Sequence, residues 1–448
     1  MIRRVALLAF TLAAGAALAH GLEEEMLPFL ASGDTGHLTG SLAGARIHQP
    51  AGQTLPLKPT RRIAFDTDEG TWMSVDLSPD GRRIVFDLLG DLYSLDAAGG
   101  QATPITRGLA FDTQPAYSPD GQWIAFVSDR SGAENVWVSH PDGTQPRQVS
   151  FGDDDTPLVS PAWSADGQSL YVSRFLWSLN SYELWRYGLD GSEALVVPIK
   201  SASGPELATL GAAVTPDGQQ VYFARHVDGD DASGVPNWAI VRRDIESGKE
   251  ETLIPAPPGP GRRAYPGTYF RPALSPDGKQ LAYATRFQGQ TGLRVRDLTS
   301  GDDHWVAFPI EHDQLQAQSW QDIVPRYTFT RDSKALILSR NGKLERLPLS
   351  DGASVPIPFS ASVDIQLGPL TRVTVKQETG PVRARLIQTP VQSPDGKTLA
   401  FSALGHLYLM PLDGRSKPRR LTKGDVPEFH PSWSPDGRDL VFVTWTAK

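Results

Sequence analysis

The sequence contains no cysteine among its 448 residues, and it lacks the motifs that announce several classes of enzyme. Without cysteine the chain can form neither disulfides nor thiolate metal sites, and a cysteine nucleophile is excluded. No Gly-x-Ser-x-Gly elbow occurs, which argues against an α/β-hydrolase. No Walker-type or dinucleotide-type glycine loop follows an expected strand. The sequence therefore offers no thiol chemistry, no serine elbow and no phosphate loop.

Metal-binding motifs are missing as well. The sequence has no His-x-His, and its nine histidines are isolated from one another: His20, His37, His48, His140, His226, His304, His312, His406 and His430. None has the spacing that a metal site on one strand or helix requires. We therefore predict no catalytic residue, no metal ligand and no cofactor, and the residues alone assign the chain no enzymatic activity.

Three short acidic runs are candidates for calcium sites, because carboxylates crowded in a loop can hold Ca²⁺. They are Asp153 to Asp155, Asp228 with Asp230 and Asp231, and Asp302 with Asp303. The full calcium-loop pattern is absent from all three, and this favours solvated loops over a calcium site.

Apolar runs long enough to cross a membrane are also absent after the N-terminus. The first residues read as a secretory signal, with Arg3 and Arg4 before an apolar stretch from Val5 to Ala14, and with a small-x-small cleavage pattern at residues 17–19. The stretch is short for a bilayer span, although an uncleaved anchor is the alternative. We expect a signal peptide over 1–19, a Gly-, Ala- and Ser-rich linker over 20–57, and a periplasmic or secreted protein without a membrane span once the signal is cleaved.

Positive charge is scarce relative to negative charge. The chain has 43 basic and 51 acidic residues, and without Arg3 and Arg4 its formal charge is −10. This balance argues against nucleic acid or anionic lipid as a partner. A protein or peptide partner is the remaining expectation.

Turn formers, by contrast, are abundant, with 42 glycines and 37 prolines, and many of them fall in a repeated tetrapeptide. Five copies read Ser-Pro-Asp-Gly and three are weaker: they begin at Ser78, Ser118, Ser164, Thr215, Ser275, Thr330, Ser393 and Ser434. Successive aspartates of the repeat are 40 to 63 residues apart. Periods of this size indicate a propeller, a solenoid or an array of repeats.

The tetrapeptide has a mechanical explanation. Proline presets φ at the second turn position, aspartate accepts local backbone N–H bonds, and glycine takes the positive φ that closes the turn. We therefore interpret these residues as structural turns rather than as metal ligands or acids: Asp80, Gly81, Asp120, Gly121, Asp166, Gly167, Asp217, Gly218, Asp277, Gly278, Asp332, Asp395, Gly396, Asp436 and Gly437.

The flanks of the repeat decide between the architectures. A short apolar or aromatic strand precedes most copies, as in 161–163, and three further strands follow, as in 169–172, 183–186 and 418–422. Four short strands per repeat make one propeller blade. We predict an all-β fold, a β-propeller over 58–448 with about seven to eight four-stranded blades.

The last blade is apparently incomplete. Its first two strands are expected at 431–433 and 439–443, and residues 60–65 look like a fourth strand ahead of the first full repeat. Since a propeller must close its circle to avoid an exposed sheet edge, the missing third strand suggests that the chain is the front part of something longer. A three-stranded final blade is the alternative.

Several stretches carry a resemblance to a known family. The segment 68–76, running into 86–93, resembles the opening of the TolB-type propeller that precedes a metal-dependent amidohydrolase domain in large exported bacterial proteins. Further similar stretches follow in the same order at 126–135, 292–298, 357–359 and 431–445. The resemblance implies a propeller that serves a hydrolase.

The departure from that family is equally clear. In the family a barrel carrying His-x-His and further metal ligands follows the propeller, and no such motif occurs here. The resemblance therefore transfers no catalytic residue to this chain. It implies an accessory or substrate-gating propeller that works with an amidohydrolase domain elsewhere in the protein or in a separate chain. A stand-alone TolB-like binding scaffold of the cell envelope is the alternative, although only about forty residues stand where TolB proteins carry an α/β domain.

Overall fold

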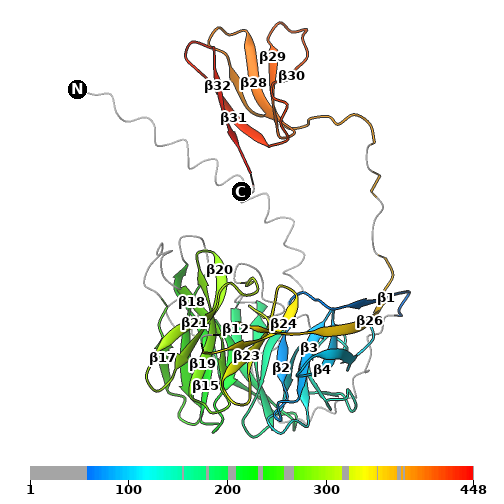
Figure 1. Ribbon diagram of the computed structural model, residues 1–448, viewed down its shortest axis with the longest axis vertical. Coiled ribbons are helices and arrows are strands. Elements are labelled where there is room, and N and C mark those ends of the chain that lie inside the picture. Colours follow the sequence, from blue (N-terminus) through cyan, green and yellow to red (C-terminus); the bar gives the residue numbers. More distant parts are fainter. Residues whose placement is uncertain are drawn as a thin grey trace, which may run out of the picture. The chain divides into compact units, whose positions relative to one another are not determined.

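The computed structural model describes residues 58–153, 156–177, 181–199, 208–230, 236–256, 267–314, 322–350, 352–370, 375–376 and 379–446 (Figure 1). The predicted signal peptide and linker lie outside these ranges. No helix within the described ranges is long and apolar enough to cross a membrane. The chain forms two compact units, Met1–Pro369 and Leu370–Lys448, and each is described by itself.

The first unit holds six sheets that each begin with a four-stranded antiparallel meander. The first three meanders are β2 (Val75–Leu77), β3 (Arg83–Leu88), β4 (Asp91–Asp96) and β5 (Gly100–Pro104); β6 (Asp112–Tyr117), β7 (Ile124–Ser128), β8 (Asn135–Ser139) and β9 (Arg147–Gln148); and β10 (Leu158–Trp163), β11 (Ser169–Leu176), β12 (Ser181–Gly188) and β13 (Glu193–Val197).

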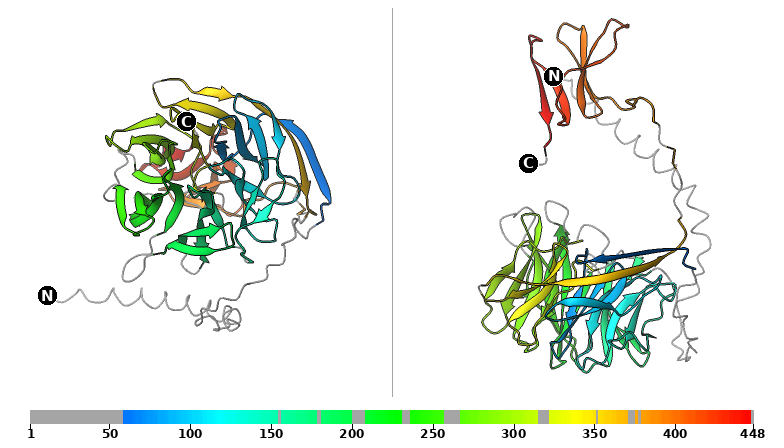
Figure 2. Two further views of the ribbon diagram at one scale, coloured as in Figure 1. Left: turned by 90° about the horizontal axis from the view of Figure 1, so that it is seen from below. Right: turned by 45° about the vertical axis from the view of Figure 1, so that its right-hand side comes forward.

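The next three follow the same order. They are β14 (Thr209–Val214), β15 (Gln220–Asp230), β16 (Pro236–Asp244) and β17 (Glu250–Ile254); β18 (Gly267–Leu274), β19 (Gln280–Phe287), β20 (Gln290–Asp297) and β21 (Asp303–Ala307); and β22 (Thr328–Phe329), β23 (Ala335–Arg340), β24 (Lys343–Pro348) and β25 (Val355–Ile357). The sheets stand around a common axis as the blades of a propeller (Figure 2, left), with the first strand of each blade on the inside.

The ring closes between the first and sixth blades of the described chain. The amide of Val75 in β2 donates to the carbonyl of Arg326, just before β22, over 3.0 Å. Phe86 and Tyr93 of the first blade share one buried apolar cluster with Ile337 and Leu344 of the sixth. Because blades are held mainly by the apolar side chains between them, this shared cluster makes the circle continuous.

A two-stranded ribbon secures this closure from outside. Strand β26 (Phe359–Leu367) leaves the sixth blade and pairs in parallel with β5 of the first, from Phe359 opposite Gly100 to Ala361 opposite Ala102. Strand β1 (Arg61–Thr67) then pairs with β26 in antiparallel fashion, which makes the first sheet six-stranded (Figure 1).

The second unit contains one more four-stranded sheet and a hairpin. Its strands are β27 (Gln388–Gln392), β28 (Thr398–Ala403), β29 (His406–Pro411), β30 (Arg419–Arg420), β31 (Glu428–Trp433) and β32 (Leu440–Thr444). The indole of Trp433 donates to the carbonyl of Val391 over 3.3 Å and joins the hairpin to the sheet. Val441 and Val443 on β32 are 69% and 54% exposed, so no further sheet covers this strand within the described residues.

The predicted all-β propeller with four-stranded blades is confirmed, and its arrangement needs one correction. The ring of the first unit contains six of the expected seven to eight blades, and the seventh and eighth repeats form the second unit. The N-terminal strand exists as β1, yet it pairs with β26 rather than completing a final blade. The physical reason is that β26 supplies the closing contact after the sixth blade.

Candidate functional site

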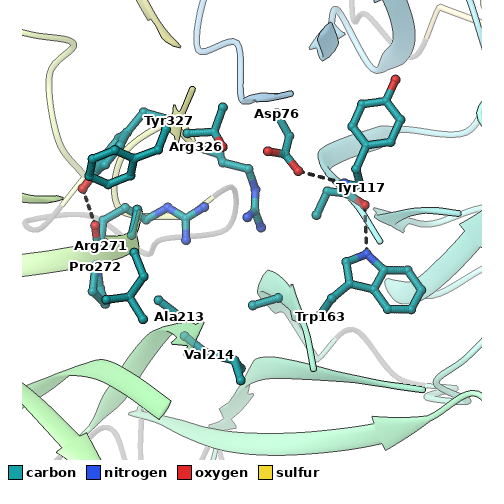
Figure 3. Close-up of a pocket in the computed structure, with 16 residues that line it drawn as sticks. Asp76, Tyr117, Trp163, Ala213, Val214, Arg271, Pro272, Arg326 and Tyr327 are labelled. Atoms are coloured by element: carbon teal, nitrogen blue, oxygen red, sulfur yellow. Dashed lines mark hydrogen bonds between the residues drawn. The ribbon is translucent and has the colours of Figure 1, made fainter. Parts of the chain in front are cut away.

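A cavity lies in the central channel of the ring. Its volume is about 250 Å³, and residues on or just before the innermost strand of every blade line it. Four successive blades each contribute an alanine to the wall, which leaves space at the axis: Ala116, Ala162, Ala213 and Ala273. Asp76, Arg271 and Arg326 bring charge into this space, as Figure 3 shows.

A β-bulge recurs on the innermost strands, and in the fifth blade it carries Arg271, which lines the cavity. Four residues before the turn tetrapeptide, Gln114, Ser160 and Arg271 adopt φ values of 58°, 58° and 54°. The strand register shifts at this point in β6, β10 and β18. Because a bulge inserts one unpaired residue and turns its side chain, the bulge in β18 explains how Arg271 comes to line the cavity. Arg326 occupies the same position relative to its turn, although its φ is not positive.

Arg271 is buried in a polar network. Its Nε lies 3.2 Å from Oδ2 of Asp322, and its side chain is only 4% exposed. Asp322 in turn accepts a hydrogen bond from the Ser160 hydroxyl at 2.5 Å, which spans two non-adjacent blades. The hydroxyl of Tyr327 donates to the carbonyl of Arg271. The Asp322 carboxylate, itself held by Ser160, therefore positions the guanidinium of Arg271, while Tyr327 holds the backbone of the same residue.

Arg326 is held by a backbone carbonyl of another blade. One of its Nη atoms donates to the carbonyl of Pro161, and its Nε has no hydrogen-bond partner although it is buried. Burial, and then the nearby Arg271 guanidinium, lower the pKa of Arg326 to about 10. The residue remains charged at neutral pH, so a cation stands partly unpaired in the channel.

Asp76 faces this cation from the first blade (Figure 3). Its carboxylate accepts the amide of Tyr117 at 2.8 Å and the amide of Leu77 at 2.9 Å. Burial raises the pKa of Asp76, while Arg326 and these hydrogen bonds oppose the rise. Opposite charges therefore line two sides of one cavity.

The turn residues predicted from the sequence lie elsewhere. Each tetrapeptide joins the first and second strands of its repeat, and none of the predicted turn residues is among those that line the cavity. In the first copy the Ser78 hydroxyl donates to Asp80 at 2.6 Å, and Asp80 accepts the amide of Arg82 at 3.0 Å. The hydroxyl bond is the main cause that lowers the pKa of Asp80.

The same geometry recurs in the other copies, whose glycines take positive φ. Hydroxyl bonds of the same kind reach the remaining turn aspartates, Asp120, Asp166, Asp217, Asp277, Asp332, Asp395 and Asp436. In the sixth copy Ser333 replaces glycine and still has φ of 58°.

The three acidic runs fall only partly within the described chain. Asp303 binds Nε of Arg294 at 2.7 Å and accepts the Tyr283 hydroxyl at 2.5 Å, so its carboxylate serves the fifth blade. Asp154, Asp155 and Asp231 lie outside the described residues. Within the described ranges, no three His, Asp or Glu side chains are placed to hold a metal ion.

The channel residues Asp76, Arg271, Asp322 and Arg326 were not predicted from the sequence. A signal existed, because Arg271 and Arg326 both stand four residues before a turn tetrapeptide. Alignment of the first six repeats on that turn would have shown two arginines at a position held in the other four by serine, glutamine or glycine.

Comparisons with known proteins agree with this architecture. Residues 73–233 match the model of the Tricorn protease N-terminal β-propeller domain. Over these residues the chain is similar to a Tricorn-type β-propeller, which agrees with the blades seen in the first unit.

Two curated relatives are similar to parts of this chain, and one is named as a peptidase and the other as a TolB protein. The uncharacterized peptidase YuxL of Bacillus subtilis is 27% identical over 199 residues, which cover 35% of this chain and 30% of the peptidase. The Tol-Pal system protein TolB of Desulfosudis oleivorans is 32% identical over 85 residues, covering 18% of this chain and 19% of that protein. The matched segments thus span less than a third of either relative.

A solved structure of a puromycin-hydrolyzing peptidase from Mycobacterium tuberculosis is also similar. It is 18% identical, with a TM-score of 0.42, and the alignment covers 74% of this chain and 49% of that one. The two curated relatives are named as a peptidase and a TolB protein, and neither is named as an amidohydrolase.

Proposed function

We propose that the chain is an exported, ligand-binding propeller that serves a hydrolase by selecting or admitting substrate at its channel. The observation that carries this proposal is the polar cavity at the centre of a closed ring. A structural ring alone would fill its axis with apolar side chains, because burying unpaired guanidinium groups costs free energy. This ring instead holds Arg271 and Arg326 in a space of about 250 Å³.

The similarity to peptidase propellers supports the hydrolase half of the proposal. A relative named as a peptidase matches the chain over 199 residues. The finer assignment, an amidohydrolase partner, rests on the sequence resemblance alone. In either case the catalytic groups would belong to another domain or chain. The propeller would determine which substrates reach those groups.

Retention of ligands by the channel tests this function. The full chain without residues 1–19 is immobilised and exposed to a defined library of short peptides, and retained peptides are identified by mass spectrometry. We expect retention that disappears in Ala213→Trp, because the indole fills the cavity that Ala213 lines. Ala98→Trp, at a turn away from the channel, is the matched control. If Ala213→Trp still retains peptides, or if the wild type retains none, the channel is not a ligand-binding site and the proposal is wrong.

A stand-alone TolB-like scaffold of the cell envelope is the second candidate, and the match to a TolB protein favours it. It requires a protein partner rather than a small ligand. A pull-down with purified envelope lipoproteins separates the two, because a scaffold would capture a lipoprotein even when Ala213→Trp blocks the channel.

A further inference from the structure

Two arginines from adjacent blades point into the same cavity with donors to spare. Arg271 comes from β18 and Arg326 from the residues just before β22, and the close-up shows both guanidinium groups entering the space (Figure 3). Nε of Arg326 is buried without a hydrogen-bond partner, and Nε of Arg271 meets Asp322 as an ion pair that lacks hydrogen-bond geometry. A buried donor left unpaired costs about 1 to 3 kcal/mol, and more when it is charged. An acceptor that enters the cavity would meet the two guanidinium groups and offset part of this cost.

The surrounding charges select the kind of acceptor. Three carboxylates act on Arg326, those of Asp76, Asp322 and Asp87, against the single cation of Arg271. Together with Arg326 itself, these groups sum to a formal charge of −1, so the site has no net positive charge and can attract an anion only through the directed N–H donors of its two guanidinium groups. A dianionic phosphate would be repelled by the three carboxylates, whereas one carboxylate carries a single charge and matches the fork of a guanidinium.

The size and walls of the cavity select the rest of the ligand. Its volume, about 250 Å³, is below the usual range for a whole small-molecule ligand, about 300 to 1,000 Å³. It fits the end of a larger molecule better than a complete one. Tyr117 and Trp163 form an aromatic wall beside the alanines, which suits an apolar group next to the carboxylate.

We propose that the channel is a carboxylate-binding site in which Arg271 and Arg326 hold the terminal carboxylate of a ligand. The inference rests on the proposed ligand-binding function and names the chemistry of its ligand. Asp322 and Ser160 act as positioning residues, because they fix Arg271 through the contacts of 3.2 and 2.5 Å. The carboxylate could belong to a peptide chain end or to a small carboxylic acid.

Calorimetric titration of the full chain without residues 1–19 tests the site with three probes. They are an N-acetylated tripeptide ending in phenylalanine, the same peptide as its C-terminal amide, and phenylacetate. We expect the acid to bind at least about tenfold more tightly than the amide, because only the acid presents a charge to the guanidinium groups. Phenylacetate that binds as tightly as the peptide acid identifies a small carboxylic acid as the ligand, and weaker phenylacetate binding identifies a chain end.

Variants of the arginines complete the test. Arg326→Gln should abolish the preference for the acid, while Arg82→Gln, an exposed arginine at the first turn, should leave it intact. Thermal unfolding of each variant checks folding. If Arg326→Gln does not fold, Arg326→Lys keeps the charge and should weaken binding through loss of the forked geometry.

Equal binding of acid and amide, an unchanged preference in a folded Arg326 variant, or no binding of any carboxylate probe would overturn the carboxylate site. The broader proposal is judged separately, since peptide retention that is lost in Ala213→Trp would still show a ligand-binding channel.

Discussion

At the scale of single residues, Asp87 shows how a buried charge can hold two blades together. Its carboxylate accepts the amide of Ser74 at 2.7 Å, the hydroxyl of Thr113 at 2.8 Å and the amide of Gln114 at 2.8 Å. Burial nevertheless raises its pKa to about 6, so the hydrogen bonds offset only part of the desolvation. The carboxylate therefore links the first and second blades through hydrogen bonds, although its burial costs solvation free energy.

Removal of Asp87 should destabilise the ring strongly. Asp87→Ala leaves two buried amides and one hydroxyl without their acceptor, and we expect a loss of about 3 kcal/mol or more in the free energy of unfolding. Urea denaturation measures it. Asp68→Ala is the control, since Asp68 is exposed and pairs with Lys343 only at the surface, where such pairs contribute about 0 to 1 kcal/mol. Similar losses in both variants would contradict the role of Asp87.

The buried carboxyl group of Asp91 should make the stability of the fold depend on pH. Burial, and then the neighbouring Asp112, raise its pKa to about 7, and its Oδ1 has no hydrogen-bond partner. A carboxyl whose folded pKa is raised stabilises the fold below its unfolded pKa, near 4, and this stability is lost as the pH rises through 7. Wild-type stability should therefore fall between pH 5 and pH 8.

Asp91→Asn should remove much of that dependence. We expect the variant to gain on the wild type as the pH rises, by at most about 4 kcal/mol at pH 8, because asparagine cannot ionise. Thermal melts at pH 5 and pH 8 give the comparison. If the wild type instead became more stable than Asp91→Asn as the pH rises, the ionised carboxylate of Asp91 would be stabilised by its surroundings, and this prediction would be wrong.

At the scale of elements, the ribbon of β26 and β1 joins the ring at the place where it closes. Phe359 at the start of β26 is 5% exposed and lies edge-on against Phe86, with ring centroids 5.2 Å apart. Ala361 and Val363 on the same strand are buried as well. The strand therefore brings apolar side chains of its own to the joint between the first and last blades.

Truncation of Phe359 should loosen this closure. Phe359→Ala is expected to cost about 3 to 5 kcal/mol, the usual loss for an aromatic side chain removed from a core. Val355→Ala is the control, since Val355 is 54% exposed and its loss should stay within about 0.5 kcal/mol. Equal melting temperatures for wild type and Phe359→Ala would show that the ribbon is dispensable.

The turn that opens each repeat was predictable, and the ribbon was not. The turn can be predicted from the tetrapeptide alone, because proline, aspartate and glycine each have a local role in the turn. Strand β26 has an alternating pattern like any other strand, and its partner β5 lies more than two hundred residues earlier in the chain. The sequence around β26 cannot show that it pairs with β5, because the two strands become neighbours only when the ring closes.

At the scale of the whole molecule, the chain is one closed ring and a second unit of one sheet and a hairpin. Within the ring, second strands such as β7 are fully buried, whereas β32 exposes most of its residues. The sequence held one hint of the boundary between the units, since the longest interval between turn aspartates, 63 residues, separates Asp332 from Asp395. The interval from Asp217 to Asp277, 60 residues, is almost as long although it lies within the ring, and it concealed this hint. The charges of the channel became visible only when six blades met at one axis.

The closed six-bladed ring should be a self-contained module, and calorimetric unfolding of residues 58–369 alone tests this most directly. We expect a compact monomer with one sharp transition, within about 3 °C of the ring transition in the full chain, because the shared cluster and the ribbon close the circle without the second unit. Aggregation, or a broad transition at much lower temperature, would contradict this and show that the ring needs residues beyond 369.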